Sequence, residues 1–250
     1  MLETENTNIA NKTLAKYSDK PIVIKSTEQW TKENSTLGLK NFLGVGKEFD
    51  NHFMIAVNYN KPESIESTYV HEVLHLILAY EGFPKVYIDN DILQKTVPPR
   101  MHQSIHMLAA YFDSTIDHPE IYTRMKDGYN LDMESYFGGL LIQKQTRFNS
   151  KRNGDPNEVL FDLQQNILDS VEYFYYQNKK EEILTLYKGV SPRAYSSSVK
   201  LNAIINKIGF STPAKALKMA NEIMRHIIRF GVKRQLHPSL TNLWKSLVIK

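Results

Sequence analysis

The chain of 250 residues contains no cysteine. Disulfide bonds and thiolate metal sites are therefore excluded, and any metal must be held by nitrogen or oxygen ligands. No run of about eighteen apolar residues occurs, so no transmembrane helix is expected. The first twenty residues are polar and lack an apolar stretch after a basic start, so they do not resemble a secretory signal. These absences predict a cytoplasmic protein without a membrane span.

Histidine is also uncommon, with eight residues, yet two of them fall within the string His71-Glu72-Val73-Leu74-His75. Positions i and i+4 lie on one face of a helix, about 6 Å apart along its axis, so two imidazoles at this spacing can reach one zinc ion. Glu72, beside the first histidine, is placed to hold a water at that ion and to take its proton. The string therefore predicts a catalytic zinc site.

The surrounding sequence places this string inside a helix. Residues 52–59 are rich in apolar and aromatic side chains and predict a strand. Pro62 predicts a helix start, and Gly82, which precedes Phe83 and Pro84, predicts its end. A strand is therefore expected to lead into a helix of about twenty residues that carries the two histidines near its middle.

This strand and helix resemble the zincin-type (HExxH) zinc metallopeptidases over about 30 residues of the chain. The resemblance implies His71 and His75 as zinc ligands, Glu72 as general base, and a peptide or amide bond as substrate. It does not extend to the third histidine of the metzincin subgroup, because Glu81 stands there and points away from the metal. The resemblance also implies that residues 52–59 pair with an extended substrate.

A catalytic zinc needs a third protein ligand, and we expect it within residues 113–120. Pro119 predicts the start of a short helix that ends at Gly128, so His118 would cap that helix. Histidine is not a preferred cap, and its presence at a rigid junction favours a role as ligand. An amphipathic helix over residues 98–113 would bring this corner to the metal. The alternative ligands are Glu120, Asp117, Asp113, His106, His102 and Glu158.

The whole chain is predicted to be α+β and mostly helical, with a small N-terminal sheet, the HExxH helix and a helical C-terminal part. Residues 1–20 are expected to form a flexible arm, residues 21–150 a zincin-like metal-binding domain, and residues 151–250 a helical subdomain with a basic tail. Turn-forming residues at 149–156 predict the linker.

The basic tail runs over residues 211–250, which hold eight Lys and Arg against a single acidic residue, Glu222. A surface rich in positive charge attracts nucleic acid, acidic protein or an anionic membrane surface. No nucleic-acid-binding motif accompanies it, so a solvated helix face is favoured over a nucleic-acid interface.

Two functions of different class fit these features. The first is a zinc-dependent hydrolase of peptide bonds, in which Glu72 passes the proton to the leaving amine and Tyr122, Tyr129 or His106 stabilises the oxyanion. Its partner would be a peptide or protein substrate. The second is a zincin-like binding or regulatory protein without turnover, which recognises a partner through its basic helical C-terminal region. An incomplete metal site would favour the second.

Overall fold

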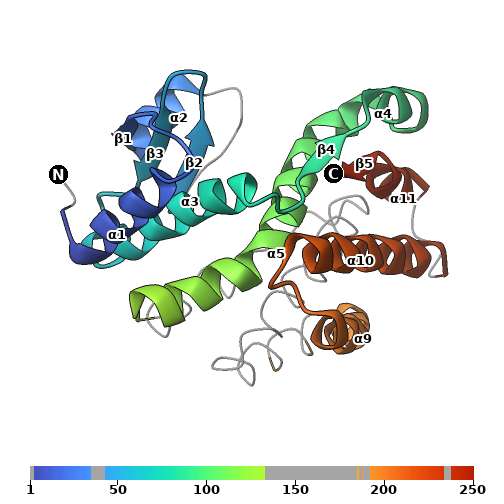
Figure 1. The fold of residues 1–250 in the computed structure, drawn as a ribbon. Coiled ribbons are helices and arrows are strands. Elements are labelled where there is room, and N and C mark those ends of the chain that lie inside the picture. Colours follow the sequence, from blue (N-terminus) through green and yellow to red (C-terminus); the bar gives the residue numbers. More distant parts are fainter. Residues whose placement is uncertain (1–2, 35–42, 133–184, 186–187, 189–191, 234–237) are drawn as a thin grey trace. The chain divides into compact units, whose positions relative to one another are not determined.

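The structure is a computed structural model (Figure 1). It describes residues 3–34, 43–132, 185, 188, 192–233 and 238–250. Within these ranges the fold is α+β and mostly helical, as the sequence predicts. None of the helices in this part of the chain is long and apolar enough to cross a membrane.

The chain divides into two compact units. One consists of Met1–Gly82 with Ile121–Tyr136, and the other of Phe83–Glu120 with Phe137–Lys250. The first unit contains the predicted small sheet and the HExxH helix. The boundary predicted near residue 150 and its linker at 149–156 lie outside the described residues.

The sheet of the first unit has three strands in the order β1-β3-β2. Strand β3 (Phe53–Val57) is central, and it pairs in parallel with β1 (Ile22–Ser26) and antiparallel with β2 (Gly44–Glu48). All five residues of β3 are buried, as expected for a strand covered on both faces. The strand predicted at 52–59 is therefore confirmed, but both of its edges are already hydrogen-bonded.

Helix α3 (Ile65–Tyr80) is the predicted motif helix, and a 3-10 turn, η2 (Pro62–Ser64), leads into it. It packs on one face of the sheet, where Phe53 meets Tyr80 edge-on with ring centroids 6.2 Å apart. Most residues in the middle of α3 are buried, so the polar residues of the HExxH string lie among buried apolar side chains.

Helix α2 (Thr27–Glu33) packs on the opposite face of the sheet. Trp30 from this helix contacts Met54 and Ala56 of β3 in a small apolar cluster. Successive residues of a strand point to opposite faces, so Phe53 faces α3 while its neighbour Met54 faces α2. The sheet is thus covered by helices on both sides.

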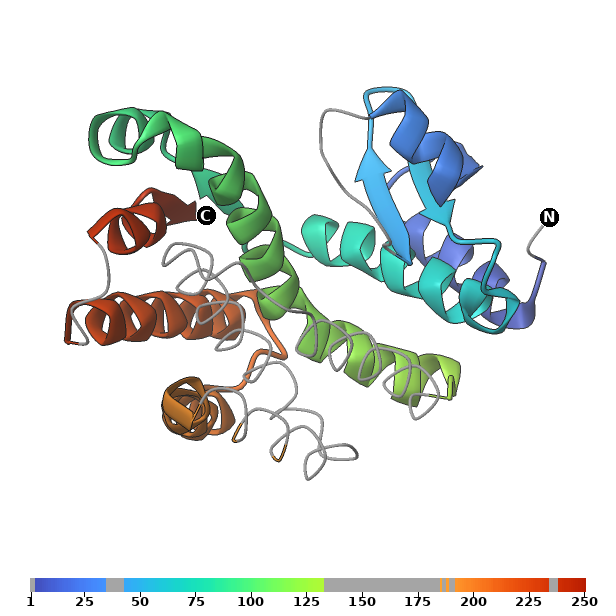
Figure 2. The ribbon, with the colours of Figure 1, turned by 180° about the vertical axis from the view of Figure 1, so that it is seen from behind.

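Helix α1 (Glu5–Leu14) stands where the sequence predicted a flexible arm over residues 1–20, and that prediction is wrong. The helix lies along α3 in both views (Figures 1 and 2). The hydroxyl of Tyr69 on α3 donates a hydrogen bond of 2.8 Å to Asn11 Oδ1. The polar segment conceals an inward stripe at helical spacing, made of Thr7, Ala10 and Leu14.

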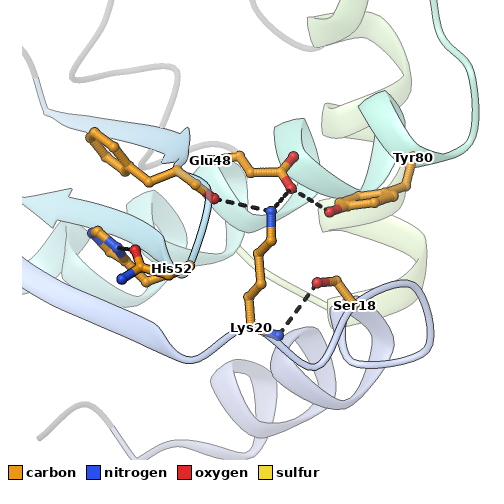
Figure 3. Close-up of polar contacts among 7 residues, drawn as sticks. Ser18, Lys20, Glu48, His52 and Tyr80 are labelled. Carbon is orange, nitrogen blue, oxygen red and sulfur yellow. Dashed lines mark hydrogen bonds and ion pairs between the residues drawn. The ribbon is translucent and has the colours of Figure 1, made fainter.

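A polar network holds the end of β2 beside the end of α3 (Figure 3). Lys20 Nζ donates to Glu48 Oε1 at 2.6 Å and to the carbonyl oxygen of Phe49 at 3.0 Å. The hydroxyl of Tyr80 donates to the same Glu48 oxygen at 2.6 Å. The hydrogen bonds from Lys20 and Tyr80 hold the pKa of Glu48 below its ordinary value. Since Glu48 ends β2 and Tyr80 ends α3, the network fixes one end of the strand beside the motif helix.

In the second unit, two short strands form an antiparallel pair, β4 (Val86–Ile88) with β5 (Leu247–Ile249). Helix α10 packs on α9 and α11, and α11 packs on α4. These helices are α4 (Asn90–Thr96), α9 (Pro192–Ile208), α10 (Pro213–Lys233) and α11 (Pro238–Lys245). A 3-10 turn, η3 (Pro99–Met101), leads into α5 (His102–Tyr129), which contributes residues to both units.

An ion pair joins the end of α3 to α5 within the first unit. Arg124 donates two hydrogen bonds to the carboxylate of Glu81, at 2.9 and 2.6 Å, and the hydroxyl of Tyr17 adds a third at 3.1 Å. The hydrogen bonds from Arg124 hold the pKa of Glu81 below its ordinary value. Glu81, which helix geometry predicts to point away from the metal, thus has a structural role.

We expect Glu81→Gln to lower the free energy of unfolding by about 1–2 kcal/mol at neutral pH, because a half-buried Arg124 loses its carboxylate. The pKa of Glu81 is lowered from 4.5 in the folded chain, so its stabilisation is complete above that pH and is lost as pH falls through the folded pKa. Urea unfolding at neutral and at acidic pH measures the difference, with Glu66→Gln on the same helix as control. A Glu81→Gln deficit that does not change with pH would contradict the ion pair.

Candidate metal centre

Helix α3 carries both motif histidines. His71 is buried, with 5 % of its surface exposed, and His75 is half-buried, as is Glu72 between them. The two imidazole rings have centroids 4.9 Å apart and planes at 74°. The predicted i, i+4 spacing therefore brings the two imidazoles together on one face of a largely buried helix.

His118 lies within α5 and does not cap a helix, so the predicted helix start at Pro119 is wrong. A proline inside a helix loses one backbone hydrogen bond and costs about 3 kcal/mol, which is why the sequence favoured a break. The helix continues because apolar residues on both sides of the proline are fully buried. These residues are Phe112, Ile116, Ile121 and Met125.

The three histidines form one group. His71, His75 and His118 each offer a ring nitrogen, and these nitrogens all lie within 4.8 Å of one another. Nitrogens bound to one tetrahedral zinc lie about 3.4 Å apart, given a Zn–N distance of about 2.0–2.1 Å. The nitrogens would move closer together by up to about 1.4 Å on binding, and the group could hold a metal ion.

The position of Tyr122 agrees with this grouping. Its ring centroid lies 5.8 Å from that of His71, and its side chain is buried with 1 % exposed. Tyr122 follows His118 by four residues on α5, so the two side chains share one face of that helix. The face of α5 that carries His118 is thus the face that meets the motif helix at His71.

Most of the other predicted ligands are engaged elsewhere or lie apart from this group. Lys85 Nζ contacts Asp117 at 2.5 Å and Asp113 at 3.4 Å, and Asp113 also accepts the amide of Val86 at 2.9 Å. The metal-binding group found among the described residues does not include Glu120, and His106 is exposed. His102 Nε2 lies 2.9 Å from the carbonyl oxygen of Val97. Glu158 lies outside the described residues.

Contacts of Lys85 with Asp113 and Asp117 fix the part of α5 that precedes His118. Asp117 is fully buried and directly precedes His118, and Lys85 directly precedes β4. The backbone of Lys85 pairs with that of Lys250 in both directions, at 2.8 and 3.1 Å. The strand pair and α5 are therefore linked through a partly buried ion pair one residue before His118.

Strand β2 passes unusually close to Glu72, and two glycines allow the approach. A Cβ added at Gly44 would overlap Thr68 Cγ2 and would lie 2.9 Å from Glu72 Oε1. A Cβ at Gly46 would lie 2.8 Å from the carbonyl oxygen of Glu72. Both distances are too short for a real side chain, so β2 meets the motif helix with bare main chain. These glycines were not among the predicted site residues, although alternate glycines in a strand indicate close backbone approach.

The edge strand beside the motif is β2, which corrects the expectation that residues 52–59 pair with a substrate. Those residues form the central strand β3, whose hydrogen-bonding groups are taken by β1 and β2. Among the described strands β2 has β3 as its partner on one side, and its other side carries no ladder. Strand order arises from contacts distant in sequence, so the local pattern could not reveal it.

Of the residues predicted to stabilise an oxyanion, Tyr122 lies against His71, whereas His106 is exposed and Tyr129 lies against Thr13 of α1. The site is thus made of residues from α3 and α5, with β2 beside Glu72. A scan against protein-family models gave no match, and searches of curated proteins and of solved structures gave none either.

Proposed function

We propose that this protein is a zinc-dependent hydrolase that cleaves peptide bonds, with Glu72 as general base. One observation carries the proposal, namely that His71, His75 and His118 offer three ring nitrogens in one group while Glu72 lies beside the first of them in the HExxH string. A catalytic zinc takes three protein ligands and keeps one position open, and this group supplies that number.

Zinc suits the donor set. Three imidazoles without a thiolate form a site of the kind that zinc uses for catalysis. Imidazole also binds copper, iron and nickel, so metal analysis has to identify the ion. When bound, zinc would polarise the scissile carbonyl and lower the pKa of a water molecule.

Glu72 has the position that a general base requires. It directly follows His71 on α3 and is half-buried, so its carboxylate is partly shielded from solvent. It would take the proton of the attacking water and give it to the nitrogen of the leaving amine. Tyr122, against His71, is the candidate to donate a hydrogen bond to the developing oxyanion.

The edge of β2 offers a docking place for the substrate. An extended peptide adds to a free sheet edge through main-chain hydrogen bonds, and β2 lies close enough to Glu72 that a Cβ at Gly46 would clash with it. A peptide aligned on this edge would be held near the proposed base. The alternative, a binding protein without turnover, predicts an incomplete metal site, and the third histidine favours the enzyme.

Metal content and hydrolysis of a protein substrate test the proposal together. The purified chain should contain about one zinc per molecule, because three ligands converge. It should cleave an unfolded protein such as reduced casein, lose that activity after dialysis against a chelator, and regain it when zinc is returned. Mass spectrometry of the metal and of the peptides measures both. A chain that binds zinc stoichiometrically but cleaves no peptide from a broad peptide library would support the binding-protein alternative.

A further inference from the structure

Helix α10 has one strongly basic face. At about 100° per residue, its charged side chains fall within an arc of about 80° and extend over about 27 Å of the helix axis. All the cations among them are exposed. The residues of this stripe are Lys215, Lys218, Glu222, Arg225, Arg229 and Lys233.

The opposite face of α10 is occupied by packing. Its buried residues are Ala216, Met219, Ala220, Ile223, Ile227 and Gly231. The helix contacts α9 and α11 through this side. Most of the apolar surface of α10 is therefore used within the unit, although Leu217 and Val232 are exposed, and the charged surface that the helix presents outward is the basic stripe.

Helix α9 adds to the same basic surface. Ser197 of α9 and His226 of α10 form a hydrogen bond of 2.7 Å where the two helices meet. Lys200 is exposed and follows Ser197 by one helical turn, and Arg229 follows His226 by one turn. Burial lowers the pKa of His226, and the positive charges of Lys200 and Arg229 lower it further. Both cations thus lie near the crossing of the helices.

This charge is hardly neutralised. Between Pro192 and Lys233 the sequence has eight Lys and Arg and one acidic residue, Glu222. Glu222 pairs with Arg225 at 2.5 Å. Six of the other cations, Lys200, Lys207, Lys215, Lys218, Arg229 and Lys233, form no ion pair within the described ranges. Repulsion among unpaired like charges destabilises a fold, so an anionic partner would stabilise this surface.

We propose that this basic surface, formed by Lys200 of α9 and the cations of the α10 stripe, binds the phosphate backbone of double-stranded nucleic acid without regard to base sequence. A row of separated cations on a rigid helix matches a polymer that carries charge at regular intervals. No aromatic side chain lies in the stripe, so the base stacking that favours single strands is absent from it. The inference does not depend on the proposed hydrolysis.

Two other anionic partners fit less well. A helix that binds membranes inserts an apolar face beside its cations, and the apolar face of α10 is buried within the unit. An acidic protein would need an apolar centre in the interface, which the stripe of charged side chains does not provide. A duplex needs only the cations.

Fluorescence anisotropy of the full chain with a labelled duplex of arbitrary sequence tests this inference over a range of KCl concentrations. If all six cations contact phosphates, the logarithm of the binding constant should fall against the logarithm of the salt concentration with a slope of about −5. Lys218→Gln/Arg229→Gln should weaken binding about tenfold or more at low salt and make the slope less negative by about 2. Both positions are exposed, so the variant should keep the circular dichroism spectrum of the parent.

The matched control is Lys12→Gln on α1 combined with Lys16→Gln just after that helix, which removes the same charge from exposed positions of the other unit. It should bind the duplex as the parent does. Equal losses in the two double variants would overturn the inference, because they would reflect net charge alone. Absence of duplex binding at low salt, or tighter binding to vesicles of anionic phospholipid or to poly-glutamate, would overturn it as well.

Discussion

Replacement of Glu72 by glutamine should reduce peptide hydrolysis by about two to four orders of magnitude while the zinc content stays near one per chain. Glutamine has the size and helix propensity of glutamate, so α3 should keep its packing. It cannot accept a proton, and the attacking water would lose its base. The first observable is the rate of cleavage of a quenched fluorescent peptide, and the second is the zinc content.

Glu66→Gln is the matched control for this experiment, because Glu66 lies on the same helix, six residues before Glu72, and faces another direction. It should leave the rate unchanged within about twofold. If Glu72→Gln hydrolyses the peptide at the parental rate, Glu72 is not the base. If Glu72→Gln loses zinc as well as activity, the carboxylate helps to hold the metal, and the loss of activity then follows from the loss of zinc.

A large change in metal affinity is expected when His118 is replaced. His118→Ala removes one of the three nitrogens that would bind zinc. Loss of a residue that only supports a metal ligand lowers metal affinity by about 10- to 100-fold, so loss of a ligand itself should weaken zinc binding by more than about 100-fold. His118→Glu should recover part of the affinity, since carboxylates also bind zinc. Competition with a chromophoric chelator measures the dissociation constants directly.

His106→Ala serves as the matched control, because His106 belongs to the same helix but is exposed and outside the group. The His106→Ala variant should bind zinc with the same affinity as the parent protein. Equal affinities for His118→Ala and the parent would remove His118 from the ligand set, and the peptidase proposal would then need another third ligand. Circular dichroism of each variant separates loss of a ligand from loss of the helix.

The parts of this protein that depend on local sequence were predicted well. Strand β3 and helix α3 follow from an apolar run, a proline near the start and a glycine at the end, all within about thirty residues. The spacing of His71 and His75 follows from helix geometry alone. His118 was singled out because it precedes a proline, and the structure groups it with the other two histidines, although inside one long helix.

The predictions that were wrong have a common physical origin, because each depends on contacts between residues distant in sequence. Helix α1 exists because Ala10 and Leu14 pack within the unit, which ten mostly polar residues do not reveal. The continuity of α5 through Pro119 depends on burial of its neighbours by other elements. The choice of β2 as edge strand depends on pairing across the sheet. Propensity is a weak guide wherever tertiary packing decides.

Gly44 and Gly46 of β2 limit the substitutions that this strand can accept during evolution. An edge strand usually tolerates many substitutions, because every second side chain points to solvent. Here the main chain at Gly44 and Gly46 fits against Glu72, so these two positions are as constrained as a buried core. If β2 is the docking edge that we propose, it would discriminate little between substrate side chains and would recognise the extended backbone common to all peptides. Selectivity would then have to arise from residues beyond the strand, which leaves those residues free to diversify while the strand stays constant.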